Sequence, residues 1–175
     1  MKFENKTLLL IGGAVTILSA FSAVAADLTD GQIAEIVMTA NKEEISDANI
    51  ARSITENKDV KGFAQHMIDE HSKNEKTESK LTEKDRIKPI ENEVAQTLKR
   101  DAEAKLADLK QLRGAEFDKA YIELQIEMHQ QLLTALDQKL IPAAQNTDFK
   151  GYLEETKKHV KKHLELAKKL QTAMP

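Results

Sequence analysis

Four ionisable side chains lie near the middle of four apolar helical patterns. They are Glu44, His71, His129 and His163. Three imidazoles and one carboxylate are ligand types that bind transition metals, Zn²⁺ before Fe or Cu. We therefore predict that these four residues bind a metal ion, provided that the helices bring them to one level.

Each of these residues lies on the inward row of its helix, found by stepping three and four residues along the sequence. The rows are Ile33, Val37, Ala40, Glu44, Asp47, Ala51 and Ile54; Val60, Ala64, Met67, His71, Asn74, Glu78 and Leu81; Ile122, Ile126, His129, Leu133, Leu136 and Leu140; and Leu153, Thr156, Val160, His163, Ala167 and Leu170. Each of the four candidates lies near the middle of its helix, so a bundle would place them in one layer.

Two other interpretations of the four residues stay open. They could satisfy one another as a metal-free Glu–His network, because a buried charge is costly without a partner. A small rotation of one helix could also move its residue to the rim. Residues 68, 126 and 160, three before each histidine, are apolar, so the Glu-x-x-His pattern of di-iron proteins is absent. A metal-dependent oxidase is thus disfavoured, and the sequence leans against an enzyme without deciding the question.

Two further histidines have spacings of chemical interest. His159 precedes His163 by four residues, a spacing that can chelate a metal on one helix. His66 precedes Glu70 by the same interval. The alternative in both cases is an ordinary surface residue.

The elements that must position these residues are all predicted to be helices, because apolar residues recur at helical spacing and nothing alternates as a strand would. The predicted helices are residues 30–56, 60–86, 91–112, 115–140 and 147–171. Thr29 and Gln32 form a capping-box pattern before the first helix. The other predicted boundary residues are Asn57 as a left-handed C-cap, Asp59 as an N-cap, Pro89 as a breaker, Gly114 as a C-cap, and Asn146, Thr147 and Asp148 as the start of the last helix.

The lengths of the connections predict the topology. The first two and the last two long helices are joined by short turns, so each pair forms an antiparallel hairpin. The connection between the hairpins is long and contains the helix of residues 91–112, which could travel about 30 Å. The predicted fold is therefore all-α: a ferritin-like four-helix bundle with an extra helix in the crossover.

The first 25 residues are predicted to be a cleaved signal peptide. Lys2 and Lys6 precede an uncharged apolar run, and residues 23–25 form a small-x-small cleavage pattern. The run is short for an uncleaved anchor, which is the alternative. We therefore expect a single helical domain over residues 26–175 in the periplasm, without a membrane span.

Composition narrows the functional classes. The 175 residues contain no Cys, which excludes disulfides, thiolate metal ligands and a lipid-modified Cys. Loss of the signal peptide leaves a net charge of −4, which argues against nucleic-acid binding. A basic stripe of Lys157, Lys158, Lys161 and Lys162 could contact anionic lipid, or could be a solvated face attracted by the acidic first helix.

Several short segments together resemble a known family. They are Asn41 with Glu44, residues 60–64, Met67 with residues 70–72, Phe117-Asp118 with Tyr121, His129-Gln130 and His163-Leu164. This ordered set, over about residues 28–171, resembles a bacterial exported ferritin-like domain of unknown function (domain of unknown function 4142), whose members are often labelled as outer membrane proteins. The resemblance implies an exported four-helix bundle and no established reaction.

We therefore expect a periplasmic protein that buffers, senses or carries a transition metal, zinc before iron or copper, in the response to envelope stress. The alternative is a metal-free structural or interaction protein of the cell envelope. The sequence leaves the protein partners and the oligomeric state open.

Overall fold

The computed structural model describes residues 28–174, and in that range the chain forms helices and connecting turns without any strand. The prediction of an all-helical fold is thereby confirmed. The elements are α2 (Asp30–Ile54), α3 (Lys58–Asp85), α4 (Glu93–Leu109), α5 (Gly114–Ala135), a π-helical turn η1 (Leu136–Leu140), the single turn α6 (Ile141–Ala143) and α7 (Thr147–Ala173). The predicted signal peptide lies outside the described residues.

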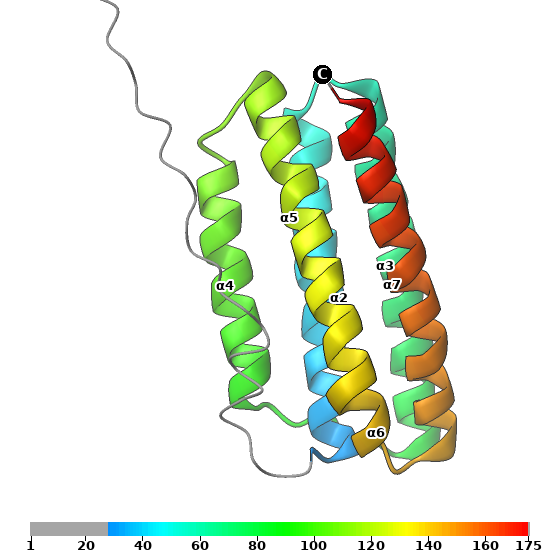
Figure 1. The fold of residues 1–175 in the computed structure, drawn as a ribbon. Coiled ribbons are helices and arrows are strands. Elements are labelled where there is room, and N and C mark those ends of the chain that lie inside the picture. The colour runs from blue at the N-terminus through cyan, green and yellow to red at the C-terminus, as the bar shows by residue number, and fades with distance from the viewer. Residues whose placement is uncertain (1–27, 175) are drawn as a thin grey trace, which may run out of the picture.

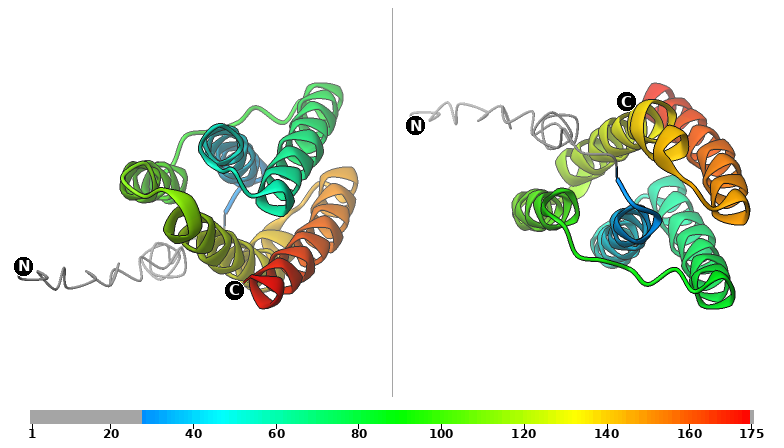
Figure 2. Two further views of the ribbon diagram at one scale, coloured as in Figure 1. Left: turned by 90° about the horizontal axis from the view of Figure 1, so that it is seen from above. Right: turned by 90° about the horizontal axis from the view of Figure 1, so that it is seen from below.

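The long helices pack side by side along their lengths (Figure 1). Helices α2 and α3 form one antiparallel hairpin, and α5 and α7 form the other. The two hairpins meet where α3 packs on α7. Helix α4 lies outside, against α2, and carries the chain from one end of the molecule to the other between α3 and α5 (Figures 1 and 2).

The first helix begins as the sequence predicts. The Thr29 hydroxyl accepts a hydrogen bond from the Gln32 N–H, and the Gln32 side chain accepts one from the Thr29 N–H, which completes the capping box. The prediction for the next boundary was wrong. Asn57 has φ −71° and serves as the N-cap of α3, accepting from the backbone N–H groups of Asp59 and Val60. Because Thr55 already leaves the helix in an extended conformation, no left-handed residue is needed in this turn.

The crossover segment before α4 is fixed against the start of α2. Arg86 has φ 55° and ends α3, and the chain then runs extended past Pro89. The Ile90 N–H donates to the Gly31 carbonyl at 2.9 Å. A Cβ atom on Gly31 would lie 2.5 Å from the Lys88 carbonyl oxygen, so only glycine fits this close approach.

Two predicted helix ends differ from the structure. Helix α4 ends at Leu109 with Lys110 as its C-cap, so Gly114 (φ 56°) is the first residue of α5 and not the C-cap of the preceding helix. Helix α5 does not stop before Pro142. It continues through η1 into α6, which contains Pro142 in its first turn. Proline lacks the N–H that an uninterrupted α-helix needs, and Pro142 lies just after the π-helical turn, where the hydrogen-bond pattern of the helix changes.

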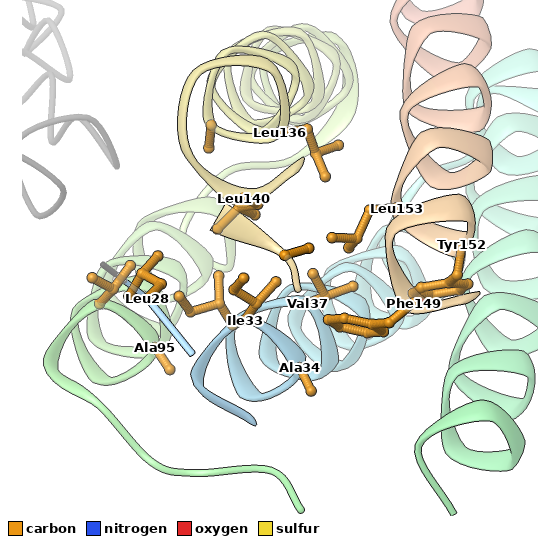
Figure 3. Packing of buried hydrophobic residues seen from close by; sticks show 14 of the residues in the cluster. Leu28, Ile33, Ala34, Val37, Ala95, Leu136, Leu140, Phe149, Tyr152 and Leu153 are labelled. Carbon is orange, nitrogen blue, oxygen red and sulfur yellow. The ribbon is translucent and has the colours of Figure 1, made fainter. Parts of the chain in front are cut away.

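The core is divided along the long axis of the molecule. One apolar cluster joins the start of α2 to the end of α5 and the start of α7 (Figure 3), and includes Ile33, Leu140 and Phe149. A second cluster at the opposite end includes Met67 and Phe117. Between them lie buried polar residues from the middle of the helices, among them Gln125 and His129. None of the helices in residues 28–174 has an apolar stretch long enough to cross a lipid bilayer.

Candidate metal centre

Three buried histidines meet between the two apolar clusters. His71 of α3, His129 of α5 and His163 of α7 are each 4% exposed or less. One ligand nitrogen from each lies within 4.8 Å of the other two. Their ring centroids are 5.2–5.9 Å apart. The layer that the heptad rows predict therefore exists for these three residues.

The orientation of His71 is set by a side chain of α2. Its Nδ1 lies 3.0 Å from Asn41 Oδ1. An amide oxygen can only accept, so Nδ1 carries the proton and Nε2 keeps a free lone pair. That Nε2 is buried and has no hydrogen-bond partner.

His129 is oriented by its own helix. Its Nδ1–H donates to the Gln125 carbonyl oxygen at 2.8 Å, which again leaves Nε2 free, buried and unpartnered. In metal sites a ligating histidine usually donates its second N–H to a carbonyl or carboxylate in this way. His71 and His129 both show this arrangement, each through its Nδ1.

Glu44 is adjacent to the three histidines but does not join the group of converging ligand atoms. Its Oε1 lies 3.7 Å from His129 Nδ1, the nitrogen already bonded to Gln125, and its Oε2 accepts from Gln125 Nε2 at 3.0 Å. The structure therefore places Glu44 behind His129, where its negative charge would stabilise a cation bound at Nε2. Its predicted role as a direct ligand has no support in this geometry.

The protonation states of the histidines suit a metal. Burial, followed by the neighbouring histidines, lowers the pKa of His71 well below its usual range. The same causes lower the pKa of His163 to about 3. These two imidazoles are neutral at pH 7, and metal binding requires neutral imidazole.

The distances allow a bound ion after a small adjustment. Three nitrogens bound to Zn²⁺ at 2.0–2.1 Å in a tetrahedron lie about 3.4 Å apart. The observed limit of 4.8 Å thus requires the rings to close by roughly 1 Å. The unpartnered nitrogens are His71 Nε2, His129 Nε2 and His163 Nδ1, one from each histidine. The residues present therefore fit a three-histidine site with a fourth position open to an outside ligand.

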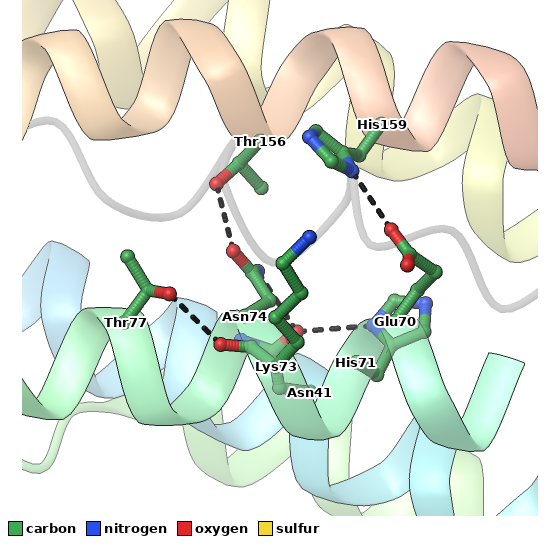
Figure 4. A network of polar contacts seen from close by, with 8 residues as sticks. All are labelled: Asn41, Glu70, His71, Lys73, Asn74, Thr77, Thr156 and His159. Carbon is green, nitrogen blue, oxygen red and sulfur yellow. Dashed lines mark hydrogen bonds and ion pairs between the residues drawn. The ribbon is translucent and has the colours of Figure 1, made fainter.

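A second group of polar residues extends from His71 toward the start of α7 (Figure 4). Asn41 Oδ1 also accepts from Asn74 Nδ2 at 3.1 Å, and Asn74 Oδ1 accepts from the Thr156 hydroxyl at 3.4 Å. On its other side, the Asn41 amide donates to Glu78, whose pKa burial raises to about 8. This group holds Asn41, and through it the ring of His71, in one orientation.

A separate buried carboxyl lies one turn from Glu44. Asp47 is 1% exposed, and neither of its oxygens has a hydrogen-bond partner within the described chain. Burial, with Glu44 and Glu43 nearby, raises the pKa of Asp47 to about 8. Asp47 is therefore mostly protonated and neutral at pH 7. The Tyr121 hydroxyl is also buried without a partner, and burial raises the pKa of Tyr121 well above its usual range.

Sequence reasoning missed the residues that orient the ligands. Asn74, Glu78 and Thr156 lie on the predicted inward rows, but the sequence prediction takes only one polar residue from each row as a site residue. Asn41 lies one position off its row and is nevertheless 3% exposed. Buried polar residues close to a candidate ligand are the signal that could have found them, because such residues need partners.

The predicted lysine stripe is partly engaged within the molecule. Lys157 pairs with Asp137 of η1, and Lys158 pairs with Glu155 of its own helix. Contact of the stripe with anionic lipid stays a prediction.

Comparison with known proteins gives the family. A family described as a domain of unknown function, DUF4142, matches residues 18–170. The chain belongs to this family. No functionally curated protein matches it.

A solved structure shares the fold. The crystal structure of a Streptomyces coelicolor protein, described as secreted protein DUF305, superposes with a TM-score of 0.68 at 14% sequence identity. The match covers 86% of this DUF4142 chain and 96% of the other. At this identity, the likeness concerns the arrangement of the helices alone.

Proposed function

We propose that this protein binds one transition-metal ion through His71, His129 and His163, and that it buffers, senses or carries that metal. Two observations together carry the proposal: the three buried histidines bring one ring nitrogen each within 4.8 Å of one another, and each histidine has a buried ring nitrogen without a hydrogen-bond partner. Leaving such atoms unpaired is costly, and a metal ion would satisfy all three at once. Zn²⁺ suits three imidazole ligands best, and Fe and Cu are the alternatives.

We also propose that the fold is a ferritin-like bundle and that the protein is located in the periplasm. A ferritin-like four-helix bundle accounts for two antiparallel hairpins joined by a helix-bearing crossover. Export to the periplasm is supported by the signal-like first segment of the sequence and by a structural neighbour described as secreted. Metal ligands on facing helices are a recurrent use of such bundles.

A metal-free structural or interaction protein is the second candidate. The hydrogen bonds among Asn41, His71, Asn74 and Thr156 favour it, because a satisfied polar group can fix the register of a bundle. Those bonds, however, occupy only one nitrogen of His71. They leave its other nitrogen, and one on each of the other two histidines, without a partner.

Elemental analysis of the mature protein tests the proposal. The protein is purified from the periplasm without a His tag or chelator, beside a His71→Ala/His163→Ala double variant and a Glu44→Gln variant. We expect close to one metal per chain in the wild type, none in the double variant, and wild-type content in Glu44→Gln, because Glu44 lies behind His129.

Two results would contradict the proposal or its details. A folded wild type that contains no metal, and takes up none on titration with Zn²⁺, Fe²⁺ or Cu²⁺, would leave the histidine layer as structure. Loss of metal from a folded Glu44→Gln variant would instead show that the site needs the Glu44 carboxylate, either as a ligand or as a charge beside His129.

A further inference from the structure

The two histidines that the proposed site does not use lie beside it. The chain contains five histidines in all, and His66 and His159 are the two outside the converging group. The ring of His66 lies 5.6 Å from that of His163, centroid to centroid. His159 lines the same small cavity as His71 and His163. Every histidine of the chain therefore belongs to one cluster on α3, α5 and α7.

Exposure rises from the inner to the outer members of this cluster. His71 and His163 are each 4% exposed, whereas the side chain of His159 is 44% exposed and that of Glu70 25%. His66 is also exposed. The cluster thus extends from solvent to the buried centre along the line where α3 meets α7.

His159 and Glu70 face each other across this line (Figure 4). His159 Nδ1 lies 3.2 Å from Glu70 Oε2, so one residue of α7 and one of α3 form a hydrogen-bonded pair at the surface. The cavity that both residues line is about 20 Å³ and also reaches His71 and His163. That volume holds about one water molecule or one bare ion.

A second cavity in the described part of the chain does not reach the histidines. The larger hollow between α4 and α5 is lined by Lys105, Glu127 and their neighbours, and by none of the five histidines. Lys105 and Glu127 are joined there by an ion pair of 2.9 Å. Its lining also includes the carboxylates of Asp108 and Glu123, but it has no histidine that would connect it to the buried centre. Along the α3–α7 line, by contrast, histidines extend from the surface to that centre.

A metal ion that moves from solvent to the buried histidines needs a new ligand at each step of its path. A hydrated metal ion must lose most of its water before it reaches a site that is 4% exposed, and losing water without replacement is costly. Imidazole and carboxylate replace water in the first coordination shell of transition metals. Ring spacings of 5.6 Å from His66 to His163 and 5.2 Å from His163 to His71 are short enough for one ligand to take the ion before the previous one releases it.

We propose that His66, His159 and Glu70 form an entry station that takes a transition-metal cation from solvent and passes it to His163 and His71. The inference rests on the proposed function, since it needs a metal at the inner centre. In this proposal, the outer residues set the rate at which metal enters and leaves, and they do not set the affinity of the inner site for the metal.

The test measures loading rates and equilibrium binding separately. Co²⁺ is mixed with the metal-free mature protein in a stopped-flow spectrometer, and its visible absorption reports arrival at the inner centre. The wild type is compared with His66→Gln/His159→Gln, with Glu70→Gln, and with Glu165→Gln as a matched control for loss of an exposed carboxylate.

The expected result is a change in rate alone. The His66→Gln/His159→Gln variant should load at least 10-fold more slowly and release Co²⁺ to excess chelator more slowly by the same factor. Its stoichiometry should stay at one, and its Kd should change by less than about 3-fold. Glu70→Gln should slow both rates by a smaller factor, and Glu165→Gln should change neither.

Each contrary outcome identifies what fails. Wild-type rates in a folded double variant would overturn the entry station while leaving the inner site intact. Loss of equilibrium binding in that variant would make the outer histidines resting ligands, which also overturns the station. A wild type that binds no Co²⁺ or Zn²⁺ would overturn the proposed function itself.

Discussion

Asn41 holds a central position among the side chains around the three buried histidines. Its oxygen fixes the tautomer and the ring plane of His71, while its amide is held by Glu78. Hydrogen-bond partners of this kind set the direction in which a ligand nitrogen points. The affinity of the centre should therefore depend on a residue that never touches the metal.

Replacing Asn41 should weaken metal binding without removing it. In Asn41→Ala the ring of His71 loses its acceptor, and we expect Kd for Zn²⁺ to rise about 10–100-fold. Competition titration against a chromophoric chelator measures the change. Asn49→Ala is the matched control, since Asn49 is an exposed residue of the same helix that bonds only to its own backbone. Unchanged affinity in a folded Asn41→Ala protein would show that His71 needs no such support.

Asp47 should make the metal-free protein less stable as the pH rises. Its pKa is about 8 in the folded state and about 3.9 in the unfolded chain. Between these values the folded state binds more protons than the unfolded state, so the free energy of unfolding falls as pH increases. Below about pH 4 both states are protonated, and Asp47 adds no pH dependence there.

The variant Asp47→Asn removes this effect. We expect the substitution to increase the free energy of unfolding by about 1–3 kcal/mol at pH 8.5 and to change it little at pH 4. Urea denaturation at the two pH values measures it. Asp108→Asn, at an exposed position, should be neutral at both. Equal effects of Asp47→Asn at the two pH values would mean that folding does not raise the pKa of Asp47.

The sequence predicted the three histidines that meet between the helices, but it did not predict the residues that orient them. His71, His129 and His163 could be found because helical spacing alone decides which positions face inward. The position of Glu44 relative to the histidines could not be predicted, because it depends on which edge of the His129 ring faces α2. Asn41 escaped because it lies one step off its row, and its burial results from the packing of α3 against α2.

At the level of the elements, the crossover is the connection under the tightest steric constraint. It passes so close to the start of α2 that Gly31 has no room for a side chain. Gly31→Ala should therefore destabilise the protein by about 1–3 kcal/mol, because the Lys88 carbonyl must move and its neighbours must shift with it. Thermal or chemical denaturation at neutral pH measures the loss.

A second glycine provides the opposite expectation. Gly151 lies within α7 with nothing within 4 Å of the Cβ position. Gly151→Ala should stabilise the protein by roughly 0.5–1 kcal/mol, because alanine loses less conformational freedom in a helix. If Gly31→Ala proved as harmless as Gly151→Ala, the close contact between the crossover and α2 would not be a feature of the folded state.

Helix positions were easier to predict than helix ends. The five long helices all overlap their predicted ranges, because the apolar period continues over many residues. The errors fall at Asn57, Gly114 and Pro142, where the outcome depends on which backbone groups find partners. The π-helical turn before Pro142 leaves no signature in the pattern, since it changes hydrogen bonding and not polarity.

At the scale of the whole molecule, the candidate metal centre joins elements that are distant in sequence. His71 comes from one hairpin, and His129 and His163 come from the other. The hairpins themselves could be predicted from the short turns. The packing of α3 against α7 could not be predicted. The sequence does not determine on which side of the first hairpin the crossover places the second hairpin. A metal bound here would connect the two hairpins directly.

Metal binding should therefore stabilise the whole fold in a single transition. A ligand that binds only the folded state adds about 2.7 kcal/mol at a free concentration of 100 times Kd. For a domain of this size that corresponds to a rise in Tm of about 5–10 °C. Calorimetry of the mature protein with Zn²⁺, and then with EDTA, should show one peak that moves up and returns. The His71→Ala/His163→Ala variant should show no shift. A wild-type protein in which only part of the transition moved would mean that the ion stabilises one hairpin alone, and that the histidines of α3 and α7 do not share it.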